Sequence, residues 1–396
     1  MVAIGIGGWT ARYLGPKNLG ILSYVAALVG LLGPLGNLGI RGSLSAMLCE
    51  KQPQPGLLGS ALLIELIGTA VIAVVLIPFA WVAREPVIVG LIGISVLGNL
   101  LSSSEVFEVE LLNRERGTQL ARVNTIQILA GALLSMTALM IQAPLLVFGS
   151  LPACQSAFRA FLLGFASKSM KPLRLLSQAS WQTSRALMKR GWPLLLAGLS
   201  VSLYMKSDQV MLEWMRGPEE LGQYSVAVKV AESLYFLPVI LSNTILPRLG
   251  AGTGFIETDR DLRYLYKYSW ILGIFMTLLT FFIFPFLIIV VYGGDYDESI
   301  IALKYLAPCG FAVSSGVASA VWLNLKGGKI LKLIPIRTTI AMVANIFLNL
   351  VFIPSMGIAG AALATSISYY IATFAVTMLY SRETRSNALY LIAPLR

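Results

Sequence analysis

Long apolar runs, most of them about twenty residues or more and separated by short polar breaks, recur along the whole chain of 396 residues. Polar and apolar residues do not alternate over segments of about ten, as they do in the strands of a membrane β-barrel. A helix that crosses the hydrocarbon core of a bilayer needs roughly 20 apolar residues. Because lipid offers the backbone no hydrogen-bond partner, such runs must be helical. The pattern therefore predicts an all-α integral membrane protein.

Twelve spans can be delimited from this pattern, and the first of them is too short for a full crossing. The predicted spans are Met1–Leu14, Leu19–Ile40, Leu57–Ala83, Pro86–Leu112, Leu120–Gln142, Pro144–Phe165, Trp192–Trp214, Glu220–Leu249, Tyr264–Tyr292, Ser299–Asn324, Leu331–Ile353 and Gly357–Tyr380.

The basic residues test this assignment independently, because cytoplasmic loops of membrane proteins are enriched in Lys and Arg. Most of the 30 Lys and Arg residues lie in or beside the loops after every second span, or in the tail 381–396. The longest of these loops, the connector 166–190, is strongly basic. The asymmetry predicts a multi-pass protein of the cell membrane with both termini in the cytoplasm.

Composition agrees with the membrane prediction and restricts the function. The chain is 57% hydrophobic and 12% charged, with a mean hydropathy of +0.77, whereas soluble domains are roughly 45–50% apolar and about 25% charged. The net charge of +11 is spread over short predicted cytoplasmic segments, where it sets orientation and contacts anionic lipid headgroups. The charge therefore does not indicate a nucleic-acid partner.

Residues that carry enzyme chemistry are sparse. The chain has no histidine, and its three cysteines lie far apart in or beside apolar runs, as buried small hydrophobic residues do. Asp295-Tyr296-Asp297 resembles the metal-binding motif of glycosyltransferases, but it falls in a short predicted loop. We therefore expect no enzyme activity, no metal and no cofactor.

An internal repeat organises the chain. Gly15-Pro16-Lys17-Asn18-Leu19-Gly20 follows the first predicted span, and Gly217-Pro218-Glu219-Glu220-Leu221-Gly222 follows the seventh. A second pair, Leu112-Asn113 and Leu323-Asn324, follows the fourth and tenth spans. Matching elements six spans apart predict two six-helix halves, 1–165 and 191–380, related by a pseudo-two-fold axis along the membrane normal, with a substrate cavity between them.

At these residues the sequence resembles the Wzx-type oligosaccharide flippases, which belong to the superfamily of the MATE drug exporters and the lipid II flippases. The resemblance covers nearly the whole chain and is stronger in the C-terminal half. The stretches that carry it are Ala11–Pro16 with Leu19, Gly20 and Tyr24, then 207–225, 238–248 and 345–362. In the family a full helix precedes the first stretch, whereas ten residues precede it here, so either the start of the sequence is assigned too late or the first helix is truncated.

The resemblance implies a function. A flippase of this family moves a polyprenyl-diphosphate-linked oligosaccharide from the cytoplasmic to the outer leaflet by alternating access through a central cationic cavity. It implies lipid-linked oligosaccharide and membrane lipids as partners, with coupling to H⁺ or Na⁺ and contact with polysaccharide polymerase or export machinery as further options.

Ionisable residues inside the spans are the candidates for this mechanism, because such groups are costly in a membrane and face a bundle interior. Asp208 matches an acidic position of the family and is a candidate for gating or ion coupling, with a structural ion pair as the alternative. Lys206, two residues before it, points the other way around the helix and cannot pair with it. Glu65 lies alone in its span, where an interhelical hydrogen bond is the alternative to a role in transport.

Further candidates lie in spans six and eight and at the end of the first span. Lys229 and Glu232 are neighbours on one helix face, and they predict either an internal ion pair or, for Lys229, a diphosphate contact. Arg12 and Arg159 are candidates for contacting the substrate anion, or they reach to the membrane interface. Glu105 and Glu108, one turn apart beside Arg114 and Arg116, are expected at a solvated interface.

Three other functions compete with this hypothesis. A MATE-like antiporter of small organic cations shares the fold, but it would favour an acidic cavity over Lys and Arg. A lipid II flippase is a sibling that often has additional helices. A membrane glycan polymerase would need a long outer loop with catalytic acids or histidine, which this sequence does not contain.

Overall fold

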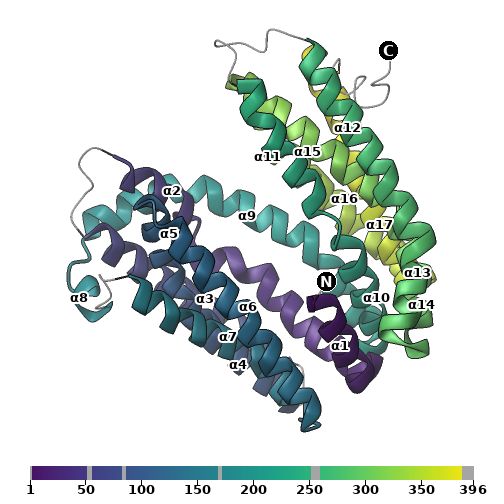
Figure 1. Ribbon diagram of the computed structural model, residues 1–396, viewed down its shortest axis with the longest axis horizontal. Coiled ribbons are helices and arrows are strands. Elements are labelled where there is room, and N and C mark those ends of the chain that lie inside the picture. Colours follow the sequence, from purple (N-terminus) through teal and green to yellow (C-terminus); the bar gives the residue numbers. More distant parts are fainter. Residues whose placement is uncertain (1, 51–55, 83–85, 168–171, 251–258, 386–396) are drawn as a thin grey trace. The chain divides into compact units, whose positions relative to one another are not determined.

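The protein is described by a computed structural model, which covers residues 2–50, 56–82, 86–167, 172–250 and 259–385 (Figure 1). Within these ranges every regular element is a helix and no β-strand occurs. The all-α class predicted from the hydropathy pattern is confirmed.

The α-helices are α1 (Val2–Asn37), α2 (Ile40–Leu48), α3 (Leu57–Val82), α4 (Pro86–Ser102), α5 (Val106–Asn113), α6 (Gly117–Met140), α7 (Leu145–Ala166), α8 (Pro172–Leu176), α9 (Trp181–Arg216), α10 (Pro218–Glu232), α11 (Phe236–Gly250), α12 (Asp259–Leu278), α13 (Phe284–Tyr292), α14 (Asp297–Leu306), α15 (Cys309–Lys326), α16 (Leu333–Met356), α17 (Ile358–Tyr370) and α18 (Val376–Tyr380). Short 3₁₀ segments lie at η1 (Ser103–Glu105), η3 (Gly294–Tyr296) and η4 (Gly328–Lys332). Short π-helical segments lie at η2 (Leu279–Ile283) and η5 (Ile371–Ala375).

Nine helical segments of the described ranges are long and apolar enough to cross a membrane. A tenth is the pair Gly294–Leu306 and Cys309–Lys326, which bends by 43° at its break. The first two predicted spans run together here into one segment, Gly5–Leu48. Helix α9 is not among the nine, and its apolar stretch contains Lys206 and Asp208. The protein is thus a multi-pass membrane protein, and the number twelve stays a prediction.

Some helices extend past the apolar runs from which the spans were predicted. The connector 166–190 contains α8 and the first turns of α9, and the span expected to start at Trp192 belongs to a helix that starts at Trp181. The span expected to end at Ile40 is followed directly by α2, which continues to Leu48. Helix propensity and tertiary packing extend these helices into sequence that is too polar to count as a span.

The chain forms two compact units. The N-terminal unit comprises residues 1–14 and 24–206, and the C-terminal unit comprises residues 15–23 and 207–396. The predicted halves, 1–165 and 191–380, stay a prediction. In the structure, helix α9 passes from one unit into the other.

The repeated Gly-Pro motifs meet inside the C-terminal unit. Gly15 has φ 71° and ψ 169°, and Gly217 has φ 91° and ψ 177°. This conformation, with positive φ and extended ψ, favours glycine. A Cβ on Gly20 would lie 1.7 Å from the Pro218 carbonyl oxygen, and a Cβ on Gly222 would lie 1.9 Å from that of Pro16. Each copy of the motif thus contacts the other reciprocally, as a two-fold axis between the two copies requires.

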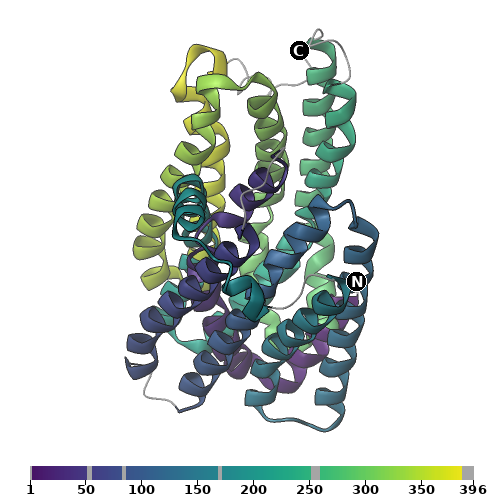
Figure 2. The same cartoon turned by 90° about the vertical axis from the view of Figure 1, so that its left-hand side faces the viewer.

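The N-terminal unit is a helical bundle in which α7 packs against α4 and α6, and α3 packs against α4 and α8 (Figure 1, Figure 2). One of its cores lies around α2. The buried residues of this core are Ile40, Leu44, Met47, Leu57, Ala61, Ile64, Val106 and Leu187. Through this core α2 packs against α3, α5 and α9. The same elements also carry polar side chains that lie close together.

The C-terminal unit is a second bundle, in which α17 packs against α16, α14 and α10, and α12 packs against α15. The π-helical segments η2 and η5 interrupt two of its helical segments, and a bend separates α14 from α15. Such interruptions are frequent at functional sites. Helix α17 contributes Thr365 and Ser366, whose hydroxyls donate hydrogen bonds to Asp208 of α9 and to the Tyr305 carbonyl of α14.

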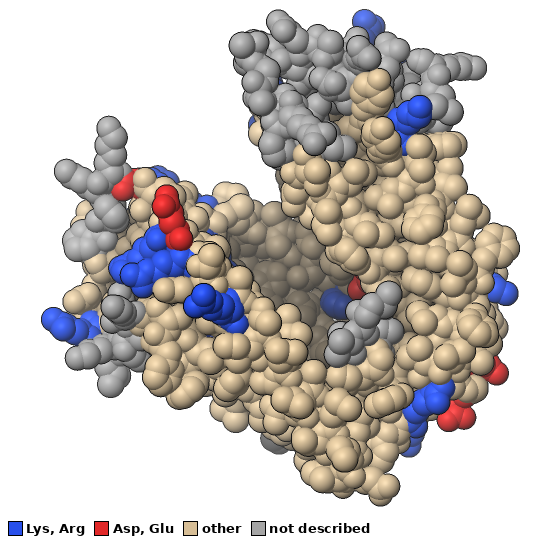
Figure 3. All heavy atoms as spheres, in the orientation of Figure 1, with Lys and Arg blue, Asp and Glu red and all other residues tan. Residues whose placement is uncertain are grey.

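The surface is apolar to an extent that suits lipid. Large hydrophobic side chains are exposed on most long helices, among them Met140 at 81% and Phe282 at 68%. In Figure 3 uncharged residues form most of the visible surface, and charged residues occur in small groups. A surface of this kind would be covered by hydrocarbon in a membrane.

Candidate functional site

Asp208 lies on α9 inside the C-terminal unit and is 4% exposed. Its Oδ2 accepts a hydrogen bond from the Tyr224 hydroxyl at 2.5 Å and one from the Thr365 hydroxyl at 3.2 Å. Its Oδ1 accepts one from the backbone amide of Gln209 at 2.8 Å. All three donors are neutral groups, and their hydrogen bonds stabilise a carboxylate.

Two asparagines on α16 extend this group. The Asn345 amide donates to Thr365 Oγ1 at 3.3 Å, and its Oδ1 accepts from Ser207 at 3.2 Å and from the Asn349 amide at 2.9 Å. Both asparagines are fully buried, and Asn349 Oδ1 has no hydrogen-bond partner. We call Asp208, Tyr224, Asn345, Asn349 and Thr365 the Asp208 network.

Glu232, the second acidic candidate of this unit, ends α10 and is half-buried. Tyr369 interacts electrostatically with both Glu232 and Asp208 and packs edge-on against Tyr235 with ring centroids 6.3 Å apart. Lys229, predicted as a neighbour of Glu232, is exposed.

The N-terminal unit contains a different arrangement of charges. Arg41 of α2 bridges Glu65 of α3, at 3.3 Å, and Glu105 of η1. Arg159 of α7 bridges Glu105 at 3.0 Å and Glu108 of α5 at 2.6 Å. We call these five residues the ion-pair network. It joins elements from five segments of the sequence through alternating acidic and basic side chains.

This network agrees with one sequence-based interpretation and corrects two others. Glu65 makes the interhelical hydrogen bond expected as the alternative to a role in transport, because Arg41 follows the break between α1 and α2 and reaches it. Arg159 does not extend to an interface; its guanidinium is held between two carboxylates and 18% exposed. Glu105 and Glu108 are 19% and 26% exposed and pair with Arg159, not with solvent and the nearby Arg114 and Arg116.

The other cationic candidates differ in exposure. Lys206 is half-buried on the N-terminal side of the unit boundary, and its side-chain carbons lie 3.8 Å from where a Cβ on Gly30 would be. In the ranges that the structure describes, its ammonium group makes no ion pair. Arg12 is exposed on α1. Lys206 and Asp208 face different surroundings, as their spacing predicts.

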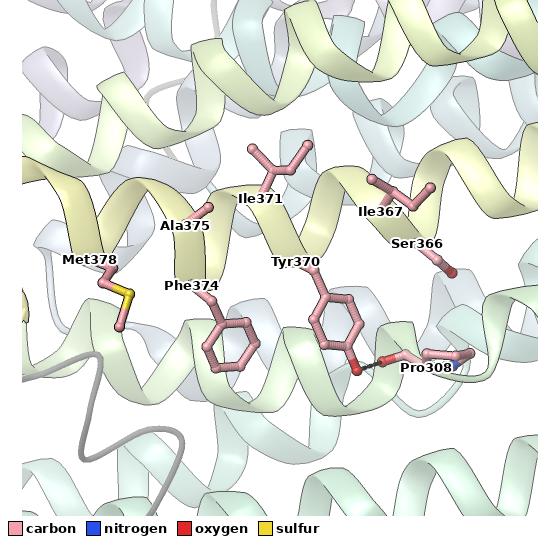
Figure 4. A pocket seen from close by; sticks show the side chains of 8 residues that line it. All are labelled: Pro308, Ser366, Ile367, Tyr370, Ile371, Phe374, Ala375 and Met378. Atoms are coloured by element: carbon pink, nitrogen blue, oxygen red, sulfur yellow. Dashed lines mark hydrogen bonds between the residues drawn. The ribbon is translucent and has the colours of Figure 1, made fainter.

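A separate groove of about 520 Å³ lies beside α17 and α18 (Figure 4). Its lining residues are Pro308, Ser366, Ile367, Tyr370, Ile371, Phe374, Ala375 and Met378. Tyr370 donates to the Pro308 carbonyl at 3.2 Å and stacks with Phe374. None of these residues is charged, so the groove does not suit a hydrated sugar or a diphosphate.

The two networks differ in what they can bind. The Asp208 network offers one carboxylate and several neutral oxygens, a set that suits a proton or a hard monovalent cation. Among the described residues no group of three or more His, Cys, Asp or Glu side chains is placed to hold a metal ion.

Four residues of the Asp208 network were not singled out from the sequence: Tyr224, Asn345, Asn349 and Thr365. Polar residues one turn apart in an apolar helix, such as the two asparagines, were the available signal.

Comparison with known proteins assigns the family. The family model of the polysaccharide biosynthesis proteins matches residues 7–252, more than half of the chain. The chain belongs to this family. The "Probable low-salt glycan biosynthesis flippase Agl15" of Haloferax volcanii is 25% identical over 378 residues, which cover 92% of this chain and 76% of that protein.

Two solved structures share the fold of this polysaccharide biosynthesis protein. The lipid II flippase MurJ in an inward closed conformation has a TM-score of 0.72 at 16% identity, covering 100% of this chain and 88% of that one. A multidrug MATE transporter of the MOP superfamily in an inward-facing conformation has a TM-score of 0.69 at 14% identity, covering 100% and 96%. At these identities the likeness establishes the fold, which confirms the MATE-like architecture.

Proposed function

We propose that the protein flips a polyprenyl-diphosphate-linked oligosaccharide from the cytoplasmic to the outer leaflet of the cell membrane during surface polysaccharide biosynthesis. The match of residues 7–252 to the polysaccharide biosynthesis proteins carries this proposal. The flippase named among its relatives supports it. Such a lipid does not cross unaided, because each polar group stripped of water costs roughly 2–7 kcal/mol.

Transport proceeds by alternating access between the two halves, while the lipid tail stays in the bilayer. The polar headgroup needs a cationic path, and Lys206 is the strongest candidate for its diphosphate. Lys206 is half-buried and makes no ion pair among the described residues, whereas Arg159 is already bound by two carboxylates. Arg12 and Lys229, both exposed, are secondary candidates.

The Asp208 network is the proposed site of ion coupling, for H⁺ or Na⁺. Asp208 is buried and accepts hydrogen bonds from Tyr224 and Thr365, and Asn349 Oδ1, which has no hydrogen-bond partner, offers a further acceptor. An ion that enters would replace the Tyr224 and Thr365 hydrogen bonds and repack α9 against α17. Binding energy at this site can thereby bias one conformation over another.

The proposed setting is the cell membrane with both termini in the cytoplasm, in line with the distribution of basic residues. The proposed partners are the lipid-linked oligosaccharide, membrane lipids and polysaccharide polymerase or export machinery, and the protein performs no covalent chemistry.

A strain that lacks this gene tests the function. Glycan-loaded polyprenyl diphosphate should accumulate on the cytoplasmic leaflet and return to normal when the gene is restored. A normal distribution between leaflets with unchanged surface polysaccharide would contradict the proposal and favour a cation antiporter of the same fold.

A further inference from the structure

The ion-pair network of the N-terminal unit has an unequal number of opposite charges. It contains three carboxylates, Glu65, Glu105 and Glu108, and two guanidinium groups, Arg41 and Arg159. If all five were ionised, one negative charge would remain without compensation in a largely buried place. A buried charge without a partner costs several kcal/mol, and such a group neutralises instead.

The geometry distinguishes the carboxyl that would be neutral. Glu105 contacts both guanidinium groups, and Glu108 pairs with Arg159 at 2.6 Å while remaining 26% exposed. Glu65 is 2% exposed and has one contact, to Arg41 at 3.3 Å. Its Oε2 is buried and has no hydrogen-bond partner. Glu65 is therefore the carboxyl with the least support for a negative charge.

The elements packed around Glu65 bring no further cation to it. Helix α3 packs against α2, α4, α5, α8 and η1, against α1 at Gly68, and against α9 in the core that contains Leu187. The charged residues of α1 and of the first turns of α9 are all exposed: Arg12, Lys17, Arg185, Lys189 and Arg190. Helix α4 has no charged residue, and the charged residue of α8, Arg174, is exposed. On α5, Glu110 pairs with Arg114 at 2.6 Å. The charges that act on Glu65 are those of Arg41, which is attractive, and Glu105, which is repulsive.

We propose that Glu65 is a proton-binding site of the N-terminal unit, distinct from the Asp208 network. With the proton bound, Arg41 pairs with Glu105, and the network contains two positive and two negative charges. When the proton leaves, Glu65 competes with Glu105 for Arg41. Arg41 lies at the start of α2, directly after Leu38 and Gly39, which both have positive φ. The proton thus controls how firmly α2 is held to η1.

The pH dependence of unfolding tests the site without measuring transport, so its outcome is separate from that of the proposed function. The folded protein favours the neutral form of the Glu65 carboxyl. Raising the pH therefore lowers the stability of the wild type, whereas Glu65→Gln cannot ionise and does not lose this stability. Between about pH 5 and about pH 8 the unfolding temperature of the full-length wild type in detergent should fall relative to the variant by roughly 2–4 °C.

The matched control is Glu50→Gln, which removes a carboxylate from an exposed pair with Arg190 and should follow the wild-type profile. An ionised Glu65 would give the opposite result. In that case Glu65→Gln would be less stable than the wild type at neutral pH, and the gap would close in acid. That outcome would overturn the proposal.

A labelling experiment on the unmodified protein covers the case in which Glu65→Gln does not fold. Dicyclohexylcarbodiimide, an apolar reagent, modifies protonated carboxyls, and mass spectrometry locates the adduct. Near pH 6 the adduct should be on Glu65, and its yield should fall severalfold towards about pH 8. Modification of Glu105 or Glu108 with Glu65 unmodified, or a yield on Glu65 that is independent of pH, would contradict the assignment.

Discussion

The two units bury carboxylates in two different ways. In the N-terminal unit Glu105 and Glu108 are held by the guanidinium group of Arg159, and the ion-pair network ties α2, α3, α5, α7 and η1 together. In the C-terminal unit Asp208 is held by a phenol, a hydroxyl and a backbone amide. Ion pairs fix helices in place, whereas the hydrogen bonds from Tyr224 and Thr365 can be exchanged for a bound ion.

This difference separates a structural role from a transport role. Removing one partner of a buried ion pair leaves the other charge uncompensated, at about 3–5 kcal/mol. A hydrogen bond from a neutral donor to a charged acceptor contributes roughly 1.5–3 kcal/mol. Substitutions in the ion-pair network should therefore affect stability first, and substitutions in the Asp208 network should affect transport first.

The largest effect is expected from Arg159→Gln, which leaves Glu105 and Glu108 facing one another without their shared cation. The free energy of unfolding should fall by about 3–5 kcal/mol, measured by denaturant or thermal unfolding in detergent. Arg190→Gln is the control, because Arg190 and Glu50 are 52% and 41% exposed, and it should change stability by less than about 1 kcal/mol. Equal effects of the two variants would show that the network does not stabilise the unit.

Asp208→Asn keeps the size of the side chain and removes its charge. We expect membrane levels and unfolding to stay near wild type, while the translocation rate falls roughly a hundredfold, which corresponds to about 2.7 kcal/mol. Asp297→Asn makes the same change at an exposed carboxylate and should transport normally. Normal translocation by Asp208→Asn would remove Asp208 from the mechanism.

Tyr224→Phe removes the hydroxyl that donates to Asp208 at 2.5 Å and keeps the buried ring. Translocation should fall about tenfold, since roughly 1.4 kcal/mol is lost from one donor. Tyr268→Phe, at a side chain that is 50% exposed, serves as the control. If both variants transported like the wild type, the Asp208 network would be structural and the contrast between the units would fail.

The smallest effect concerns Lys206. If its ammonium attracts the diphosphate, Lys206→Glu should transport several times more slowly than Lys206→Gln. The glutamate carboxylate repels the diphosphate, whereas the neutral amide of glutamine only lacks the attraction. Initial rates in the same vesicles measure the difference. Equal rates would indicate that the Lys206 stem fills space beside Gly30.

Hydropathy could predict most of the fold, because an apolar run in lipid has no alternative to a helix. The repeat could be predicted as well, since Gly20 and Gly222 belong to two matching motifs that occur at equivalent helix ends. The boundaries of α2 and α9 could not, because tertiary packing extends these helices into polar sequence.

The candidate site divides in the same way. Asp208 stands out in the sequence as an acid inside an apolar run, so it could be found without a structure. Thr365, which donates to Asp208, and Asn345, which donates to Thr365, lie far along the chain. The Arg41 that pairs with Glu65 is 24 residues away on another helix. Only the packing of α9, α16 and α17 brings the first group together, and no local pattern encodes those distances.

Translocation by the purified protein tests the central proposal most directly. Lipid-linked oligosaccharide collected from cells that lack the gene would be placed in vesicles with the protein, and membrane-impermeant periodate would report how much glycan reaches the outer surface. Wild-type protein is expected to make nearly all of the glycan reactive, while Asp208→Asn should leave reactivity at the level of empty vesicles. Equal reactivity with wild-type protein and with empty vesicles would contradict the flippase function.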